Sequence, residues 1–190
     1  MIDFPYKIIL ASKSPRRQEL LKQLGFDFES RSKDVDESFA PHLKRENVAL
    51  YLSEKKARAF RSELLQNELL ITSDTIVCKA ERIFNKAADK KEAFGMLKEL
   101  SDSSHEVITA VCLSTREKQV CFHSESKVFF RKLLDSEINY YIDNYLPFDK
   151  AGAYGIQEWI GMIGVYRIEG SFYNVMGLPV DELYQELMKF

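Results

Sequence analysis

The sequence has no excess of charge of either sign. Its 190 residues include 27 lysines and arginines and 29 aspartates and glutamates, which leaves a formal net charge of −2. Nucleic-acid-binding domains usually gather basic residues on one face, so this balance disfavours DNA or RNA as a partner. A site for an anionic ligand would have to be local.

Signals for export and for membrane insertion are also missing. The first residues include Asp3 and Pro5 and lack the basic stretch and the long apolar stretch of a secretory signal peptide. No apolar run approaches the ~20 residues that a membrane-spanning helix needs. We therefore expect a cytoplasmic protein with no membrane partner.

Cysteine and histidine are scarce, with three residues of each. The cysteines, Cys78, Cys112 and Cys121, form no C-x-x-C pair, and the histidines show no spacing typical of zinc ligands. In a reducing compartment we expect the cysteines to be buried thiols on strands.

No repeat, low-complexity segment or flexible linker divides the chain. Its 45% hydrophobic content can form a real core, and we expect a single domain over residues 1–190. The pattern G-x-x-x-x-G-K-[ST] is absent, which excludes a P-loop enzyme. Gly161–Gly164 matches the KH-domain tetrapeptide, but so short a match carries little weight.

Helix-like and strand-like segments alternate along the chain. Strands are predicted at 7–11, 26–31, 69–72, 76–78, 105–114, 119–131 and 165–169, and helices at 15–24, 45–65, 89–100, 135–144 and from 179. Residues 73–75 are expected to interrupt a strand, and the glycine-rich residues 150–164 to form a loop with strand character. The alternation favours an α/β domain with a mostly open sheet flanked by helices.

The segment 12–17 places two arginines in the first turn of a predicted helix. Ser14 is a natural N-cap and Pro15 a natural first helical residue. Arg16 and Arg17 oppose the helix dipole there, at a cost of roughly 0.3–1 kcal/mol each. A bound anion would remove this conflict. The segment is a candidate phosphate site, and an arginine pair tolerated at the surface is the open alternative.

Asp74 stands between two apolar runs. Acids are disfavoured in strands and costly to bury without a partner, so Asp74 is expected to face a pocket. There it could hold a metal ion or accept a proton from water. A turn-forming aspartate is the alternative. Lys86 could supply a charge that neutralises phosphate, although alone it signifies little.

Asp34, Asp36 and Glu37 form an acidic cluster in a predicted loop. Hard divalent cations are usually held by one or two such carboxylates together with substrate phosphates, although a solvated loop remains open. In the next helix, Lys56 falls on the apolar stripe. A lysine directed inward suits a phosphate site, and a side chain that merely snorkels to solvent is the alternative.

Residues 149–157 form a segment with small side chains and glycines at 152 and 155. Glycine allows a backbone to approach a ligand closely. At the end of the segment, the amide of Gln157 carries one acceptor and two donors, which suit the edge of a nucleobase.

Taken together, these segments resemble the Maf family, the septum-formation-associated nucleotide pyrophosphatases. The resemblance covers nearly the whole chain. It rests on motifs in the family's order at residues 11–17, 19–21, 35–37, 54–57, 73–77, 86, 149–157 and 175–179.

The resemblance implies a mixed α/β fold with a deep substrate cleft, like that of the inosine triphosphatases, often dimeric and dependent on a divalent cation. We therefore expect Mg²⁺ or Mn²⁺ as cofactor and a homodimer. Asp74 would be the catalytic proton acceptor or metal-organising acid, and Glu37 a second acid at the metal. Lys56 and Lys86 would face the phosphates. The phosphate site would use Ser12, Ser14, Arg16 and Arg17.

The resemblance also implies a choice of base. Arg16, Thr75 and Gln157 match positions that set base preference in the branch acting on dTTP and UTP. In the 7-methyl-GTP branch, tryptophan replaces Arg16 and a Ser-Glu pair replaces Ile156-Gln157. Three departures stand out: Ser73 for the commoner alanine, Ala87 where Lys-Pro is usual, and Glu158-Trp159 where many members have glycine.

The expected activity is hydrolysis of dTTP and UTP to the monophosphate and pyrophosphate, with modified pyrimidine triphosphates as further candidates. Its role would be the removal of unwanted nucleotides. The alternative is a cell-division regulator that senses a nucleotide without obligatory turnover.

Overall fold

The computed structural model describes residues 4–190. Residues 1–3 belong to the opening stretch on which we base the expectation of no signal peptide, and they lie outside the described chain. The strands are β1 (Lys7–Leu10), β2 (Phe28–Ser30), β3 (Glu68–Lys79), β4 (Arg82–Phe84), β5 (Ser104–Ser114), β6 (Gln119–Phe130) and β7 (Val165–Glu169). The α-helices are α1 (Pro15–Gln23), α2 (Glu46–Phe60), α3 (Lys90–Leu100), α4 (Asp135–Tyr145), α5 (Trp159–Gly164), α6 (Phe172–Met176) and α7 (Val180–Leu187). Two short 3-10 helices, η1 (Arg61–Glu63) and η2 (Pro147–Asp149), complete the set for these residues.

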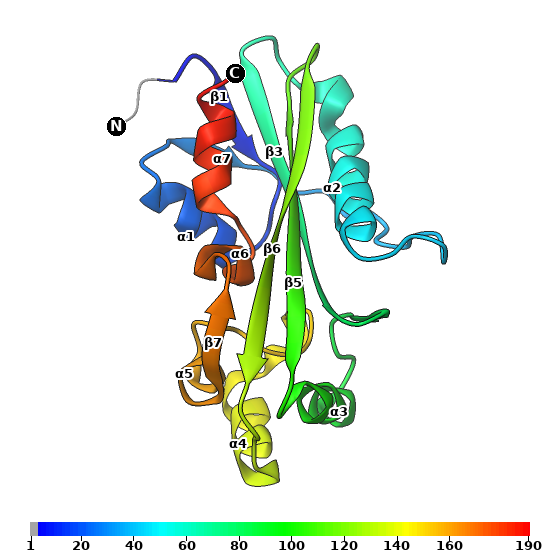
Figure 1. Ribbon diagram of the computed structural model, residues 1–190. Coiled ribbons are helices and arrows are strands. Elements are labelled where there is room, and N and C mark those ends of the chain that lie inside the picture. The colour runs from blue at the N-terminus through cyan, green and yellow to red at the C-terminus, as the bar shows by residue number, and fades with distance from the viewer. Residues whose placement is uncertain (1–3) are drawn as a thin grey trace. The chain divides into compact units, whose positions relative to one another are not determined.

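The strands form one mixed sheet in the order β2-β1-β3-β5-β6-β7, with β4 paired to β3 (Figure 1). β1 is parallel to both of its neighbours, whereas β4 and β7 are antiparallel to their partners. The structure therefore confirms the predicted mixed α/β class, with an open sheet flanked by helices.

The chain divides into two compact units. The first contains the chain up to Asp74 together with Thr109–Ser124 and Gly177–Phe190, and the second contains Thr75–Ile108 and Glu125–Met176. Strands β3, β5 and β6 contribute residues to both units. The expectation of a single domain stays a prediction.

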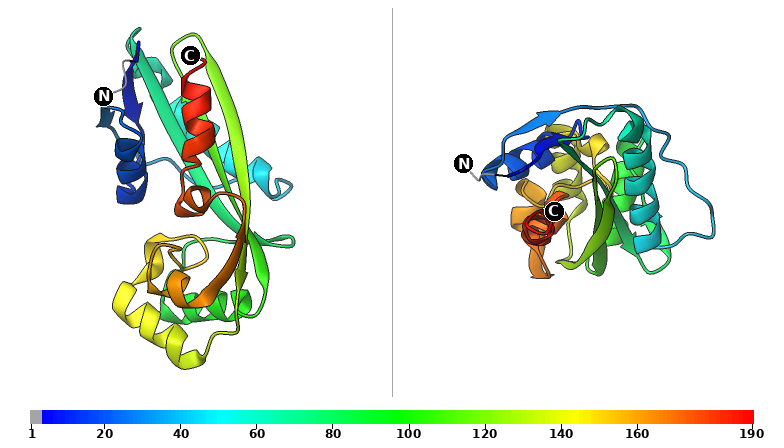
Figure 2. Two further views of the ribbon diagram at one scale, coloured as in Figure 1. Left: turned by 60° about the vertical axis from the view of Figure 1, so that its left-hand side comes forward. Right: turned by 90° about the horizontal axis from the view of Figure 1, so that it is seen from above.

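In the first unit, helices cover both faces of the sheet. α2 lies on one face, and α1 and α7 lie on the other (Figures 1 and 2). The core between α2 and the sheet is apolar and buried, and it consists of Ile9, Ala57, Phe60, Leu64, Leu70 and Cys112. This packing fixes the inner side of α2 against β3, and both elements carry predicted site residues.

The boundaries of α1 follow from local signals, as predicted. The Ser14 hydroxyl accepts a hydrogen bond from the Arg17 backbone N–H, and Pro15 opens the helix. The helix ends before Gly25, whose φ of 87° is a conformation that glycine adopts without strain.

In the second unit, α3 packs against α4 (Figure 1). The N-cap of α3 is Asp89, whose side chain accepts a hydrogen bond from the Glu92 N–H. A hydrophobic core of this unit has Phe84, Leu97, Phe130 and Tyr141 among its buried members.

Two predicted elements are wrong. Ser73–Thr75 do not interrupt a strand, because β3 runs unbroken from Glu68 to Lys79. Aspartate disfavours strands, but strand pairing and the ammonium of Lys56, which is distant in sequence, outweigh this preference at Asp74. Residues 150–164 are a loop only as far as Glu158, after which α5 begins. The short elements β4 and α6 lie in segments for which we predict no structure.

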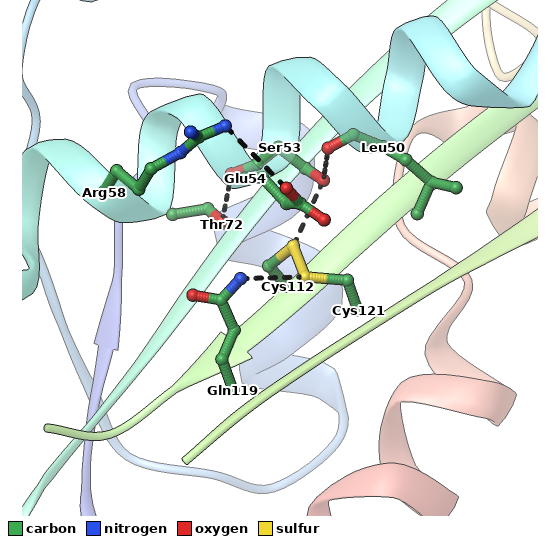
Figure 3. The surroundings of a disulfide bond; sticks show 8 residues. All are labelled: Leu50, Ser53, Glu54, Arg58, Thr72, Cys112, Gln119 and Cys121. Carbon is green, nitrogen blue, oxygen red and sulfur yellow. Dashed lines mark hydrogen bonds and ion pairs between the residues drawn. A yellow bond between two sulfur atoms is a disulfide. The ribbon is translucent and has the colours of Figure 1, made fainter. Parts of the chain in front are cut away.

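The cysteine prediction is also wrong for two of the three residues. Cys112 of β5 and Cys121 of β6 form a disulfide with an S–S distance of 2.05 Å (Figure 3). Cys78 is a buried thiol outside the disulfide, as expected. The disulfide pair is brought together by the pairing of adjacent strands, with Cα atoms 4.2 Å apart. None of the helices within residues 4–190 is long and apolar enough to cross a membrane.

Candidate active site

Asp74 is the most buried acid among the predicted site residues. It lies in the middle of β3, and its side chain is 11% exposed. Its Oδ1 atom accepts a hydrogen bond of 2.6 Å from Nζ of Lys56 on α2. Lys56 is therefore directed inward, as a phosphate-facing lysine requires, and does not simply extend into solvent.

The same ammonium reaches a second acid. Nζ of Lys56 lies 2.9 Å from Oε1 of Glu37, which projects from the loop that precedes α2. The other two acids of the predicted cluster pair elsewhere, Asp34 with Lys13 and Asp36 with Lys55. Only Glu37 of the acidic cluster thus joins Asp74 and Lys56.

A hydrogen bond that the sequence analysis missed sets the register between α2 and β3. The Thr72 hydroxyl donates to the main-chain carbonyl of Ser53 at 2.8 Å (Figure 3). Thr72 and Asp74 are two residues apart on one face of β3, and Ser53 and Lys56 are three apart on one side of α2. This bond therefore aligns Lys56 with Asp74.

The charge state of Asp74 depends on its neighbours. Burial raises the pKa of the Asp74 carboxyl, and the cations of Lys56 and Arg17 oppose this rise. Burial lowers the pKa of Arg17, and the charge of Asp74 opposes this lowering. Asp74 is thus a desolvated acid surrounded by cations, the environment in which catalytic acids and bases are found.

The predicted phosphate segment forms an ordered turn. The Ser12 hydroxyl is buried and accepts from the Ser14 N–H at 3.1 Å, while Ser14 caps α1. Arg17 donates through Nε to the carbonyl of Gly177 at 2.8 Å and through Nη1 to the carbonyl of Ser73 at 3.0 Å. Arg17 therefore connects α1 to β3 directly beside Asp74, a role that its place in the sequence did not suggest.

Three predicted site residues belong to the second unit. Thr75 follows Asp74 in β3, and Lys86 forms an isolated β-bridge with Ala151. Gly152 N–H donates to the carbonyl of Asn85 at 3.2 Å, so the segment of Lys86 is bonded to the glycine loop. In that loop residues 152–156 are buried and Gln157 is exposed. The loop thus presents the amide that we expect to read a base.

The donor set suits a hard cation that also binds phosphate. Among residues 4–190, no group of three or more histidine, cysteine, aspartate and glutamate side chains could hold a metal ion. Asp74 and Glu37 do converge on one positive charge, the ammonium of Lys56. Mg²⁺ is typically held by one or two carboxylates plus substrate phosphates, and these two acids fit that pattern.

Comparison with known proteins decides the family. Residues 7–190 match the family described as Maf-like protein. The chain belongs to the Maf family. The predicted resemblance is therefore confirmed over nearly the whole chain.

Relatives of this Maf chain are similar along their full length. It is 55% identical over 186 residues to the dTTP/UTP pyrophosphatase of Parabacteroides distasonis, covering 97% of this chain and 96% of that protein. It is 51% identical over 182 residues to the dTTP/UTP pyrophosphatase of Flavobacterium johnsoniae, covering 96% and 94%. Among solved structures, a dITP/XTP pyrophosphatase from Mycobacterium abscessus matches with a TM-score of 0.43 and 17% identity, covering 96% of each chain.

Proposed function

We propose that this Maf protein is a nucleoside triphosphate pyrophosphatase that hydrolyses dTTP and UTP to the monophosphate and pyrophosphate. Full-length relatives at 51–55% identity carry the name dTTP/UTP pyrophosphatase. The observation that carries the proposal is the buried Asp74 carboxylate, held by Lys56 beside Glu37. The cluster places a carboxylate that can accept a proton from water beside a positive charge that can bind a polyphosphate.

In the proposed reaction, Asp74 accepts a proton from a water molecule that attacks the α-phosphorus. The bond between the α-phosphorus and the oxygen bridging to the β-phosphorus breaks, and pyrophosphate leaves. Mg²⁺ or Mn²⁺, held by Asp74 and Glu37, would supply positive charge to the phosphates. Catalysis of this kind depends mostly on positioning and on charge stabilisation.

Lys56 would keep Asp74 ionised and oriented. Burial alone favours the neutral carboxylic acid, which could not accept a proton. The ammonium 2.6 Å away favours the carboxylate. An ammonium has three donors, so Lys56 can hold Asp74 and Glu37 and offer a third N–H to a phosphate oxygen. Lys86, exposed in the second unit, would add a further charge.

The remaining predicted residues would bind the two ends of the substrate. Ser12, Ser14 and Arg16 would contribute to phosphate binding at the start of α1, with Arg17 ordering that turn. Gln157 would read the base, with Arg16 and Thr75 contributing to the preference. An amide can accept from N3–H of uracil or thymine and donate to a neighbouring carbonyl.

The cellular role would be the removal of unwanted or modified nucleotides, in the cytoplasm where nucleotide pools lie. We propose a homodimer because members of the family are often dimeric. Sedimentation at micromolar concentration tests this oligomeric state. The alternative, a cell-division regulator that senses a nucleotide without turnover, would use the same residues for binding alone.

One experiment tests both the reaction and the bond that breaks. The purified protein is incubated with Mg²⁺ and UTP, dTTP, CTP, GTP or ATP in water enriched in ¹⁸O. We expect UMP and dTMP that carry the label, together with unlabelled pyrophosphate. Label in pyrophosphate, or UDP and orthophosphate as first products, would refute attack at the α-phosphorus. Binding without any product would favour the sensing alternative.

A further inference from the structure

The loop that presents Gln157 is closed by contacts between its own residues. Oε1 of Glu158 lies 3.2 Å from Nζ of Lys150, at the start of the loop. The other carboxylate oxygen, Oε2, accepts a hydrogen bond from the hydroxyl of Tyr141 on α4. That hydroxyl itself accepts a bond of 3.0 Å from the Gly155 N–H, in the middle of the loop. Glu158 thus links both ends of the loop and, through Tyr141, its centre.

These groups are largely withdrawn from water. The side chain of Lys150 is 9% exposed and that of Glu158 is 19% exposed, while Tyr141 is fully buried. A buried charge is costly unless it is paired and hydrogen-bonded. Lys150 also contacts exposed Asp149 at 2.7 Å, but Glu158 is the acid that shares its buried surroundings. Loss of Glu158 would therefore leave a buried cation and a buried hydroxyl poorly satisfied.

The direction of the bonds through Tyr141 is fixed. Burial, followed by the bond to Glu158 and the charge of Glu158, raises the pKa of the Tyr141 phenol far above its usual value. The phenol stays protonated, so its single O–H donates to Glu158 and its oxygen accepts from Gly155. The carboxylate consequently orients the hydroxyl that holds the loop backbone.

Gly155 makes the close approach of this carboxylate feasible. A Cβ atom at position 155 would lie 2.7 Å from Cδ of Glu158, well inside van der Waals contact. Glycine at position 155 therefore leaves the space that the Glu158 carboxylate occupies. Gln157, the exposed residue of the loop, lies between them in the sequence.

We propose that Glu158 is a positioning residue for base selection, which holds the loop 150–157 in the conformation that presents Gln157 to the base. This inference rests on the proposed function, in which Gln157 reads uracil or thymine. In this role Glu158 acts through its contacts with Tyr141 and Lys150 and, by way of Tyr141, on Gly155.

The test compares Glu158→Ala, Glu158→Gln and Tyr141→Phe with the unchanged protein. Glu158→Ala should lower kcat/KM for UTP and dTTP by about tenfold or more, the effect of leaving a buried donor unpaired. The loss should lie mainly in KM, and the ratio of UTP to CTP turnover should fall. Tyr141→Phe should show the same changes as Glu158→Ala. Glu158→Gln should recover part of the loss, because its amide oxygen can still accept from Tyr141.

A readout independent of turnover separates this inference from the proposed function. Hydrogen exchange of the Gly155 amide should be at least tenfold faster in Glu158→Ala and in Tyr141→Phe than in the unchanged protein. Glu186→Ala, which removes a partly exposed acid of α7 that pairs with Lys189, is the control and should change neither measurement. Unchanged exchange in Glu158→Ala would overturn the positioning role, whatever the turnover.

The kinetic measurements also distinguish the positioning role of Glu158 from the proposed function. An equal loss for every base in Glu158→Ala would mean a structural role only, and would also overturn the inference. If the unchanged protein hydrolyses no triphosphate while Gly155 exchange responds to Glu158→Ala, the proposed function fails. The positioning of the loop by Glu158 would then still stand.

Discussion

Nζ of Lys56 lies 2.6 Å from Oδ1 of Asp74, although 18 residues separate them in the sequence. The pair joins a helix to the middle of a strand, and its alignment depends on the bond from Thr72 to Ser53. The reactive acid is thus set by the packing of two rigid elements. Sites on helices and strands are held more firmly than sites on loops.

Replacing Asp74 by asparagine should abolish most turnover. Asparagine keeps the shape of the side chain and can still accept from Lys56, but it is not a base at neutral pH. We expect kcat to fall by ~10²-fold or more, with an unchanged circular dichroism spectrum. Asp143→Asn, at an exposed ion pair with Lys90, is the control. Near-normal kcat in folded Asp74→Asn would remove Asp74 from the mechanism.

Replacing Arg17 by alanine should reduce both stability and turnover. Two carbonyls, those of Ser73 and Gly177, would lose their donors, at a cost of about 1–3 kcal/mol for each buried group left unpaired. Urea denaturation measures this loss. Arg16→Ala is the matched comparison, and it should raise KM with little change in stability. If Arg17→Ala were as stable as the unchanged protein, the connecting role of Arg17 would be wrong.

Replacing Gln157 by glutamate should change the choice of base. A carboxylate can accept from N3–H of uracil or thymine but repels the neighbouring carbonyl. It suits guanine, which offers two adjacent donors. We expect kcat/KM for UTP and dTTP to fall by about 5- to 150-fold, as for one unpaired buried acceptor. GTP and 7-methyl-GTP should lose less or gain. An equal loss for all bases would show that Gln157 only supports the loop.

His105 should make the protein less stable in mild acid. Burial and, to a smaller extent, the charge of Lys79 lower the pKa of His105 from 6.5 to about 3. Its Nε2 bonds to the hydroxyl of Tyr154 at 2.7 Å. Below pH ~6.5 the unfolded chain binds a proton that the folded chain does not. The free energy of unfolding should therefore fall by about 1.4 kcal/mol for each pH unit from 6.5 down to ~3. Above pH 6.5 the full contribution of neutral His105 to stability is present.

Urea denaturation at pH 7 and pH 5 measures this dependence on His105. His105→Gln should remove most of the difference between the two pH values. His123→Gln, at an exposed position on β6, is the control that should retain it. A difference of equal size in His105→Gln would assign the pH dependence to other groups.

Reduction of the disulfide should destabilise the hairpin of β5 and β6. The bond closes a loop between Cys112 and Cys121, nine residues apart. For a loop of this size the chain-entropy model gives about 2–3 kcal/mol. Urea denaturation with and without dithiothreitol measures the effect, and Cys112→Ser/Cys121→Ser should not respond. Cys78→Ser should respond fully. Equal stability with and without reductant would mean that the bond contributes nothing to stability.

The sequence predicts best what depends on neighbours in the chain. The limits of α1 follow from Ser14, Pro15 and Gly25, which act within one turn of themselves. The unbroken course of β3 does not, because the partner of Asp74 comes from another element. The disulfide is missed for a similar reason: Cys112 and Cys121 have no telling spacing and meet only through strand pairing.

The residues of the candidate site also differ in whether the sequence suggests their roles. Residue type suggests Asp74, Lys56 and Gln157, because an acid or a lysine in an apolar run needs an explanation. Residue type does not reveal that Arg17 holds two carbonyls or that Glu158 closes the loop. Both depend on contacts across the fold, Arg17 with Gly177 and Glu158 with Tyr141.

One of the boundaries between the two units falls at the peptide bond between Asp74 and Thr75. Glu37, Lys56 and Asp74, proposed for chemistry, belong to one unit together with Arg16, whereas Thr75 and Gln157, proposed for base preference, belong to the other together with Lys86. Substitutions in the loop of Gln157 can therefore change selectivity without removing a member of the Glu37, Lys56 and Asp74 cluster. A common catalytic cluster could then serve many nucleotide contaminants, and directed evolution of new specificities should concentrate its mutations in the loop 150–157.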